Sequence, residues 1–182
     1  MAMNFCSNCG AATLELRIPD GDTLRRRVCA TCGTIHYENP KIVTGCLPVW
    51  DERVLLCKRA IEPRYGLWTL PAGFMENDES ASEGAAREAL EEANARVEIE
   101  DLYTVYSIPH ISQVYMMFRA RLLDENVSPG IESLEVKLVT AGEIPWNELA
   151  FTMVRRTLEH YIEDRKTGVF VPRFGDIAPP QR

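Results

Sequence analysis

Four of the six cysteines form two Cys-x-x-Cys-Gly pairs, and no other feature constrains the start of the chain as strongly. The pairs are Cys6–Cys9 and Cys29–Cys32, with 19 residues between them. Four thiolates complete a tetrahedral zinc site, and the turn in each pair directs two sulfur atoms at one point. Apolar stretches at 14–18 and 24–28 flank a Pro-Asp-Gly-Asp turn, which predicts a hairpin that brings the pairs together. This is zinc-ribbon spacing, and we expect a structural Zn²⁺ with no open coordination position.

Two alternatives to this metal site follow from the residues themselves. A Cys-x-x-Cys pair can also be a redox dithiol, and His36 lies close enough in sequence to Cys32 to be a rival ligand. The first residues have neither the basic region nor the apolar stretch of a secretory signal, so we expect a cytoplasmic location. Thiols stay reduced there, which favours metal binding over disulfides.

Length and charge narrow the class of protein. The chain has 182 residues, of which 46% are hydrophobic and 26% charged, and this fits one globular domain with a small appendage. No apolar run reaches the roughly 18 residues of a membrane helix. The net charge of −7 argues against non-specific nucleic-acid binding. Nearly all of this imbalance lies in residues 73–95, where seven carboxylates face a single arginine, Arg87.

The order of predicted elements divides the chain near Asn39-Pro40. We expect a zinc ribbon at 1–38 and a larger domain at 39–182. In the larger domain, alternating or β-branched stretches predict strands at 41–50, 54–59, 97–108, 113–123 and 134–140. Capping signals predict helices from Ser80 to about Ala93 and from about Met153 to Gly168, followed by an extended tail. This order predicts an α+β fold, a sheet covered by helices.

The first of these helices carries the excess of carboxylates. Glu88 and Glu92 are four residues apart and Glu88 and Glu91 three apart, so all three lie on one helix face. Oxygen clusters of this kind suit Mg²⁺ or Mn²⁺, which bind carboxylates together with substrate phosphates. Arg87 can reach Glu91 one turn on, or Glu79 before the helix, and so orient the ligands. The alternative is an ordinary solvated acidic helix.

The spacing around this helix also carries a resemblance. From Gly73 the chain reads Gly, five residues, Glu79, seven residues, Arg-Glu-Ala-Leu-Glu-Glu, one residue and Asn94. This resembles the Nudix box, which has a Gly where this chain has Asn94; Asn also adopts the positive φ needed there. The Gly-Leu-Trp-Thr-Leu-Pro lead-in, the cysteine pairs and the Asn-Pro-Lys at 39–41 resemble the zinc-ribbon subgroup. That subgroup includes NADH pyrophosphatases and plant plastid hydrolases of FAD and ADP-ribose.

The resemblance implies a Nudix-type mixed sheet between helices and hydrolysis of a nucleoside diphosphate linked to another group. It implies two or three Mg²⁺ ions that polarise phosphoryl oxygens and activate water. Glu88 and Glu92 would be ligands, Glu91 a ligand or water-orienting group, and the region of Gly73 would supply a backbone carbonyl. Family members often recruit one more downstream Glu as base or ligand, and the candidates here are Glu132 and Glu135.

Substrate contacts are predicted around this helix. Arg59 and Arg64 lie near the lead-in and can pair with phosphates, whereas Phe74 and Tyr106 can stack on a planar ring. The substrate expected from the resemblance is FAD or ADP-ribose, with AMP released. The partner expected is therefore a small nucleotide, and relatives also suggest a homodimer.

Two other functions remain open. One is a pyrophosphatase of NADH or another dinucleotide, although the Ser-Gln-Pro-Trp-Pro-Phe-Pro array of NADH-specific members is absent: Ser112-Gln113 is followed by Val-Tyr-Met-Met. The other is a non-catalytic regulator that senses nucleotides. Such regulators usually lose box carboxylates, whereas all are present here.

Overall fold

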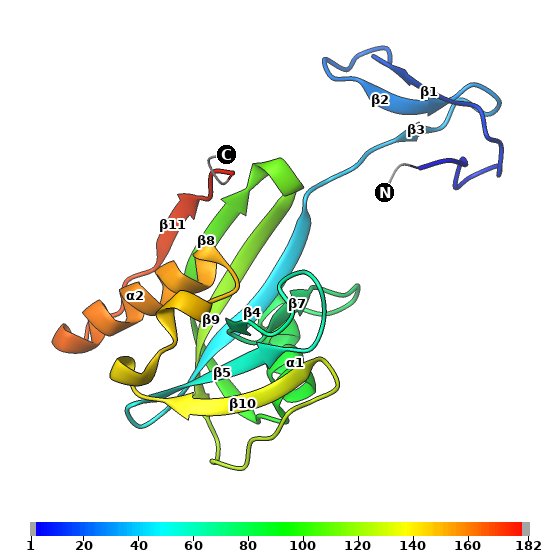
Figure 1. Ribbon diagram of the computed structural model, residues 1–182. Helices are drawn as coiled ribbons and strands as arrows, with labels where there is room; N and C mark the ends of the chain where they lie inside the picture. The colour runs from blue at the N-terminus through cyan, green and yellow to red at the C-terminus, as the bar shows by residue number, and fades with distance from the viewer. Residues whose placement is uncertain (1–2, 180–182) are drawn as a thin grey trace. The chain divides into compact units, whose positions relative to one another are not determined.

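The computed structural model describes residues 3–179, and the chain divides into a unit that ends at Asn39 and a unit that begins at Pro40. In the first unit, three short strands form an antiparallel sheet in chain order (Figure 1). They are β1 (Leu14–Arg17), β2 (Arg26–Cys29) and β3 (Ile35–His36). The hairpin between β1 and β2 falls where the two apolar stretches predicted it.

The second unit is built on one mixed sheet with strand order β10-β5-β4-β9-β8-β11 (Figure 1). The strands are β4 (Lys41–Trp50), β5 (Arg53–Arg59), β8 (Val97–Ile108), β9 (Gln113–Leu122), β10 (Ser133–Val139) and β11 (Arg173–Asp176). Two short strands, β6 (Trp68–Thr69) and β7 (Ala72–Phe74), attach to β5 and β4. The β4–β9 and β8–β11 pairs are parallel, and the remaining pairs are antiparallel.

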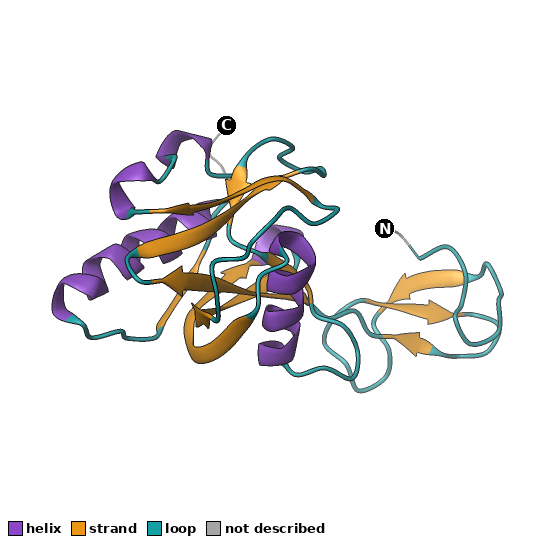
Figure 2. Cartoon of the chain, turned by 90° about the horizontal axis from the view of Figure 1, so that it is seen from below, coloured by secondary structure: helices purple, strands orange, loops and turns teal. Residues whose placement is uncertain are grey.

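Two helices, α1 (Ala81–Ala93) and α2 (Thr152–Thr167), cover the sheet, and Figure 2 draws both in purple against its strands. The period-two alternation of β5 decides which side chains each helix covers. Leu55 and Cys57 join the apolar cluster that includes the alanines of α1, whereas Val54 and Leu56 join the cluster that includes Met153 and Leu158 of α2. This confirms the predicted α+β sheet between helices. No helix within residues 3–179 is long and apolar enough to span a bilayer.

Both ends of α1 are set by local sequence. Ser80 caps the start with a reciprocal capping box, in which its hydroxyl accepts from the Glu83 N–H and the Glu83 carboxylate accepts from the Ser80 N–H. Asn94 ends the helix in the left-handed region, with φ 48°. The buried residues Ala85, Ala89 and Ala93 let the helix lie close against the sheet. Packing of these alanines against the sheet therefore fixes the position of the carboxylate face of α1.

The C-terminal tail is expected to be extended, and it forms an added edge strand, β11, parallel to β8. An ion pair anchors it, since both terminal nitrogens of Arg173 lie 2.5 Å from the two oxygens of Asp164 on α2. Tyr103 on β8 also donates to Asp164, at 2.7 Å. The adjacent Arg173 guanidinium lowers the pKa of Asp164 to about 2. The tail is thus fixed to both α2 and β8.

Candidate active site

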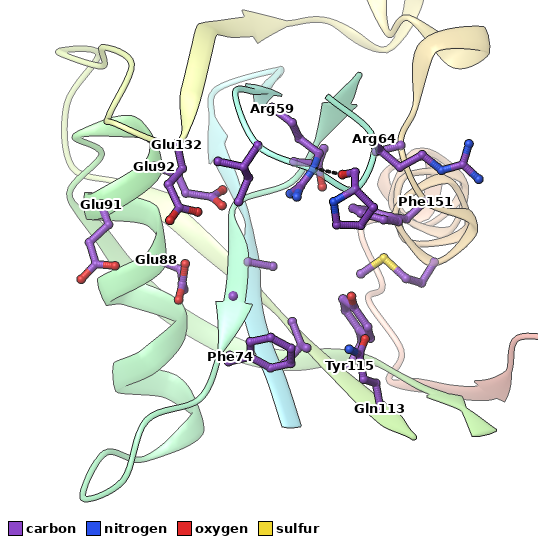
Figure 3. Close-up of a pocket in the computed structure, with 18 of the residues that line it drawn as sticks. Arg59, Arg64, Phe74, Glu88, Glu91, Glu92, Gln113, Tyr115, Glu132 and Phe151 are labelled. Atoms are coloured by element: carbon purple, nitrogen blue, oxygen red, sulfur yellow. Dashed lines mark hydrogen bonds between the residues drawn. The ribbon is translucent and has the colours of Figure 1, made fainter. Parts of the chain in front are cut away.

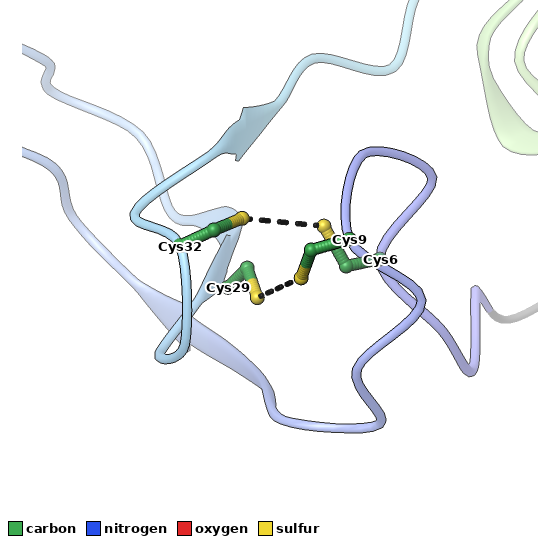
Figure 4. A group of neighbouring side chains, drawn as sticks. All are labelled: Cys6, Cys9, Cys29 and Cys32. Carbon is green, nitrogen blue, oxygen red and sulfur yellow. Dashed lines mark hydrogen bonds between the residues drawn. The ribbon is translucent and has the colours of Figure 1, made fainter.

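The four predicted cysteine ligands converge in the first unit (Figure 4). All four sulfur atoms lie within 4.8 Å of one another, and the Cys6–Cys32 and Cys9–Cys29 separations are 3.6 Å. A zinc ion about 2.3 Å from each sulfur would set them about 3.8 Å apart. The Thr34 hydroxyl hydrogen-bonds the Cys32 sulfur and lowers its pKa to about 5, which favours the thiolate. The cluster therefore fits a tetrahedral ion, and His36, the rival ligand, is not part of it.

The acidic face of α1 lines a large pocket of the second unit (Figure 3). Glu88 and Glu92 are buried, with 8% and 5% exposed, whereas Glu91 is exposed. Burial raises the pKa of Glu88, and burial together with the Glu88 charge raises the pKa of Glu92 to about 8. Among residues 3–179, none hydrogen-bonds Oε2 of Glu92. A buried carboxylate with an unpartnered oxygen, as in Glu92, is suited to bind a cation.

Arg87 links the loop before α1 to the carboxylates of the site. Its guanidinium bonds Glu79 through two nitrogens, at 2.8 and 3.0 Å, and its Nη1 bonds Glu88 at 2.7 Å and Glu91 at 3.1 Å. It also donates to the Phe74 carbonyl. The guanidinium lowers the pKa of Glu79 to about 2, so this carboxylate stays charged. Glu79 does not line the pocket, and it acts through Arg87, which holds the β7–α1 loop against the helix.

The backbone of Gly73 on β7 lies in close contact with the Glu88 carboxylate. A Cβ at this position would lie 2.3 Å from Oε1 and 2.5 Å from Oε2 of Glu88, so any side chain would displace that carboxylate. Buried carboxylates beside an accessible backbone are the hard oxygen donors that Mg²⁺ and Mn²⁺ prefer. The residues present therefore fit a divalent cation.

A loop that follows β9 docks on the end of α1. The Gly130 N–H donates to the Glu92 carbonyl at 3.0 Å, which satisfies a free carbonyl of the last helical turn. A Cβ on Gly130 would lie 1.7 Å from the Glu91 carbonyl oxygen, so only Gly permits this contact. The amide of Asn94 donates to the carbonyl and the hydroxyl of Ser128, both at 3.1 Å. Asn94, the one departure from the box, thus anchors this loop.

The two downstream glutamates, Glu132 and Glu135, lie in different environments. Glu132 lines the pocket beside Glu92, and its charge contributes to the raised pKa of Glu88 and Glu92 (Figure 3). Glu135 lies on β10, where its carboxylate meets Lys137 at 2.8 Å and Lys58 at 4.0 Å, and it does not line the pocket. The geometry favours Glu132 as the additional carboxylate of the site.

The pocket is an open cleft of about 1610 Å³, with carboxylates on one side and aromatic and basic groups on the other (Figure 3). Arg59 is buried, donates from Nε to the Pro63 carbonyl at 2.9 Å and lies over the Phe151 ring. Arg64 is exposed at the pocket wall. Phe74 is half exposed and also lines the pocket. Both arginines and Phe74 thus line the pocket, and their contact with substrate stays a prediction.

Tyr106, predicted as a stacking residue, does not line the pocket. Only 3% of it is exposed, because Gly175 of β11 lies against its ring and Arg156 of α2 covers it. Tyr115, its register partner on β9, lines the pocket instead. The expectation for Tyr106 was wrong because the strand that buries it comes from the far end of the sequence.

Comparison with known proteins identifies the family. Residues 4–38 match the family described as Nudix N-terminal, a zinc ribbon, and residues 39–161 match the NUDIX domain. This chain belongs to the Nudix family. The crystal structure of a NUDIX hydrolase from Nitrosomonas europaea is 60% identical, with a TM-score of 0.93, and the match covers 96% of this chain and 99% of that one. The predicted resemblance to zinc-ribbon Nudix hydrolases is thereby confirmed.

Curated Nudix relatives are more distant. An ADP-ribose pyrophosphatase from Methanocaldococcus jannaschii is 27% identical over 121 residues, which cover 63% of this chain and 69% of that protein. The NAD-capped RNA hydrolase NudC from Vibrio atlanticus is 27% identical over 177 residues, which cover 92% of this chain and 61% of that protein. The chain spans about two thirds or less of the length of the curated relatives it matches.

Several residues that line the pocket were not predicted from the sequence. Phe151 immediately precedes α2, and Ile177 and Ala178 follow β11, yet all three line the pocket. No local motif marks any of them. Helix α2 and strand β11 bring them to the pocket, and the β8–β11 pairing that places the tail has no counterpart in short-range sequence patterns.

Proposed function

We propose that this Nudix protein hydrolyses the pyrophosphate bond of a nucleoside diphosphate linked to another group, with ADP-ribose or FAD as substrate and AMP as a product. The observation that carries the proposal is the pair of buried carboxylates, Glu88 and Glu92, at the wall of a large pocket. The relative named ADP-ribose pyrophosphatase supports the first substrate. FAD rests on the resemblance to plant plastid hydrolases.

Glu88 and Glu92, with the backbone at Gly73, would hold Mg²⁺ or Mn²⁺. A divalent cation bound there supplies polarisation of the phosphoryl oxygens and a lower pKa for the attacking water. Arg87 keeps Glu88 and Glu91 in place through its bonds to both. Glu132, on the anchored loop, takes the proton of the attacking water on a carboxylate oxygen.

The opposite side of the pocket would hold the rest of the substrate. Arg59 and Arg64 neutralise the diphosphate charge, since guanidinium groups bind phosphate oxygens in pairs. Phe74, Tyr115 and Phe151 give the flat apolar surfaces on which planar rings stack. These contacts orient the diphosphate toward the carboxylates of α1.

A substrate panel tests this function. We expect Mg²⁺-dependent release of AMP from ADP-ribose or FAD, together with ribose 5-phosphate or FMN, when the full chain is compared on ADP-ribose, FAD, NADH, diadenosine polyphosphates and nucleoside triphosphates. EDTA should abolish turnover. Tight nucleotide binding without any product would contradict the proposal and favour the non-catalytic regulator.

A second candidate substrate is NADH or a related dinucleotide. The match to the NAD-capped RNA hydrolase covers 92% of this chain and favours keeping NADH in the panel. Faster cleavage of NADH than of ADP-ribose or FAD would select this second function.

Replacing Glu132 with Gln should lower kcat by about 100-fold or more, because a general base typically contributes at least that factor. Glu135→Gln is the matched control, since Glu135 lies on the same segment but pairs with Lys137 outside the pocket. We expect this control to retain wild-type turnover. Steady-state kinetics on one substrate decide between them, and a larger loss in Glu135→Gln would contradict the assignment.

The cysteine cluster of the first unit is proposed to hold one structural Zn²⁺ per chain, since protein thiolates fill all four positions. The homodimer and the cytoplasmic location stay predictions.

A further inference from the structure

One wall of the pocket comes from outside the matched NUDIX domain. That match ends at residue 161, whereas Ile177 and Ala178, which follow β11, line the pocket. Around them the lining residues include Ile108, Ile111 and Met153, all apolar. The pocket is therefore completed by a segment that follows the matched domain in the chain.

The register of β11 sets where this wall lies. Asp176 pairs with Ser107, and the Ile177 N–H donates to the Ser107 carbonyl at 2.9 Å. Strand β8 ends one residue later and leads into the 3-10 turn Pro109–Ile111, which also borders the pocket. Ile177 is 8% exposed and packs in the core, while Ala178 is exposed. Ile177 thus fixes the segment, and Ala178 presents it to the pocket.

Side-chain contacts anchor β11 and the residues before it, in addition to the pairing with β8. Arg173 is held by both oxygens of Asp164 and donates to the Val171 carbonyl at 2.8 Å. Phe170 stacks on Tyr161 with ring centroids 5.7 Å apart, and the Arg119 guanidinium lies over the Phe170 ring, 3.9 Å from its centroid. These contacts leave the strand little freedom relative to β8 and α2.

We propose that the C-terminal segment at Ile177 and Ala178 is a specificity wall that contacts the base of a bound nucleoside diphosphate, and that Arg173 is the residue that positions it. The proposal rests on the proposed function, because it assumes that the diphosphate binds at α1. The wall lies at the end of β8, where Ile108 is the register partner of Gln113 on β9, and Figure 3 shows the carboxylates on the side opposite Gln113. A nucleotide whose diphosphate lies at the carboxylates has room to place its base toward this end, where Ile108 and Ile111 line the pocket together with His110 and Gln113.

Binding of two matched, non-hydrolysable ligands tests the wall. Methylenediphosphonate carries only the diphosphate part, and α,β-methylene-ADP adds the nucleoside. Both are titrated into the full-length protein with Mg²⁺ by calorimetry. We expect Ala178→Phe to weaken α,β-methylene-ADP by about tenfold, the usual effect of a misfit in an apolar pocket, and to leave methylenediphosphonate unchanged.

Phe174→Ala is the matched control, because Phe174 lies on the same strand, is 73% exposed and does not line the pocket. It should bind both ligands as the wild type does. Arg173→Ala should also lose nucleoside affinity while it keeps methylenediphosphonate affinity, and Arg173→Lys should recover part of the loss by retaining the charge beside Asp164. A loss of methylenediphosphonate binding in Arg173→Ala would mean a general structural role and would overturn the positioning role.

The outcomes separate this inference from the function on which it rests. If the wild type binds α,β-methylene-ADP and Ala178→Phe binds it equally well, the wall is overturned while the proposed function stands. If the wild type binds neither ligand in Mg²⁺, the nucleotide site itself fails and the wall fails with it.

Discussion

Replacing Glu92 with Gln is expected to lower kcat by about 100-fold or more, the range seen when one preorganised electrostatic group is removed from an active site. Gln keeps the size of the side chain but removes the charge that would hold a divalent cation. Turnover at saturating Mg²⁺ measures this change. Glu148→Gln is the control, since Glu148 is exposed and does not line the pocket.

The same variant should not lose stability. Glu92 is 5% exposed, and one of its oxygens has no hydrogen-bond partner among residues 3–179, so this carboxyl group, whether ionised or protonated by its raised pKa, opposes folding when no cation is bound. We expect the melting temperature of Glu92→Gln in EDTA to equal or exceed that of the wild type. Near-wild-type turnover in this variant would contradict the catalytic role, and a large fall in melting temperature would indicate a structural one.

Removal of zinc is expected to unfold the first unit. Its buried side chains within residues 3–39 are only Cys6, Pro19, Val28, Cys29 and His36. So small a core cannot offset the entropy of ordering the chain. Structural zinc supplies about 10–16 kcal/mol of apparent binding free energy in comparable small domains, and that energy becomes folding energy.

Circular dichroism and thermal melting with and without a strong chelator measure this effect, and elemental analysis should find one zinc per chain. Cys32→Ser should reproduce the loss, and the chelator should then change the first unit no further. Protein made with zinc available that contains no metal, or a first unit that melts unchanged after chelation, would contradict the structural zinc site.

Local signals were sufficient for the elements that carry the candidate site. The capping residues Ser80 and Glu83 placed the start of α1, and the three- and four-residue spacings placed Glu88, Glu91 and Glu92 on one face. These features depend on hydrogen bonds and side chains within one or two helical turns. The same holds for the β4–β5 hairpin, whose strands end close to the predicted residues.

Contacts between segments that are far apart in the chain could not be predicted from the sequence. Nothing local indicates that the tail pairs with β8, and this pairing buries Tyr106 and brings Ala178 to the pocket. Likewise, no sequence signal distinguishes Glu132 from Glu135 as the additional carboxylate. The structure distinguishes them, because Glu132 lines the pocket whereas Glu135 lies beside lysines on β10 and β5. Sheet order and loop docking decide both cases.

The carboxylates of α1 are proposed to hold divalent cations against a diphosphate. Anomalous X-ray diffraction from crystals grown with Mn²⁺ and α,β-methylene-ADP tests it most directly. We predict Mn²⁺ bound by the carboxylates of Glu88 and Glu92 and by the diphosphate oxygens of the ligand. Mn²⁺ bound elsewhere, with both carboxylates contacting only protein, would contradict the account.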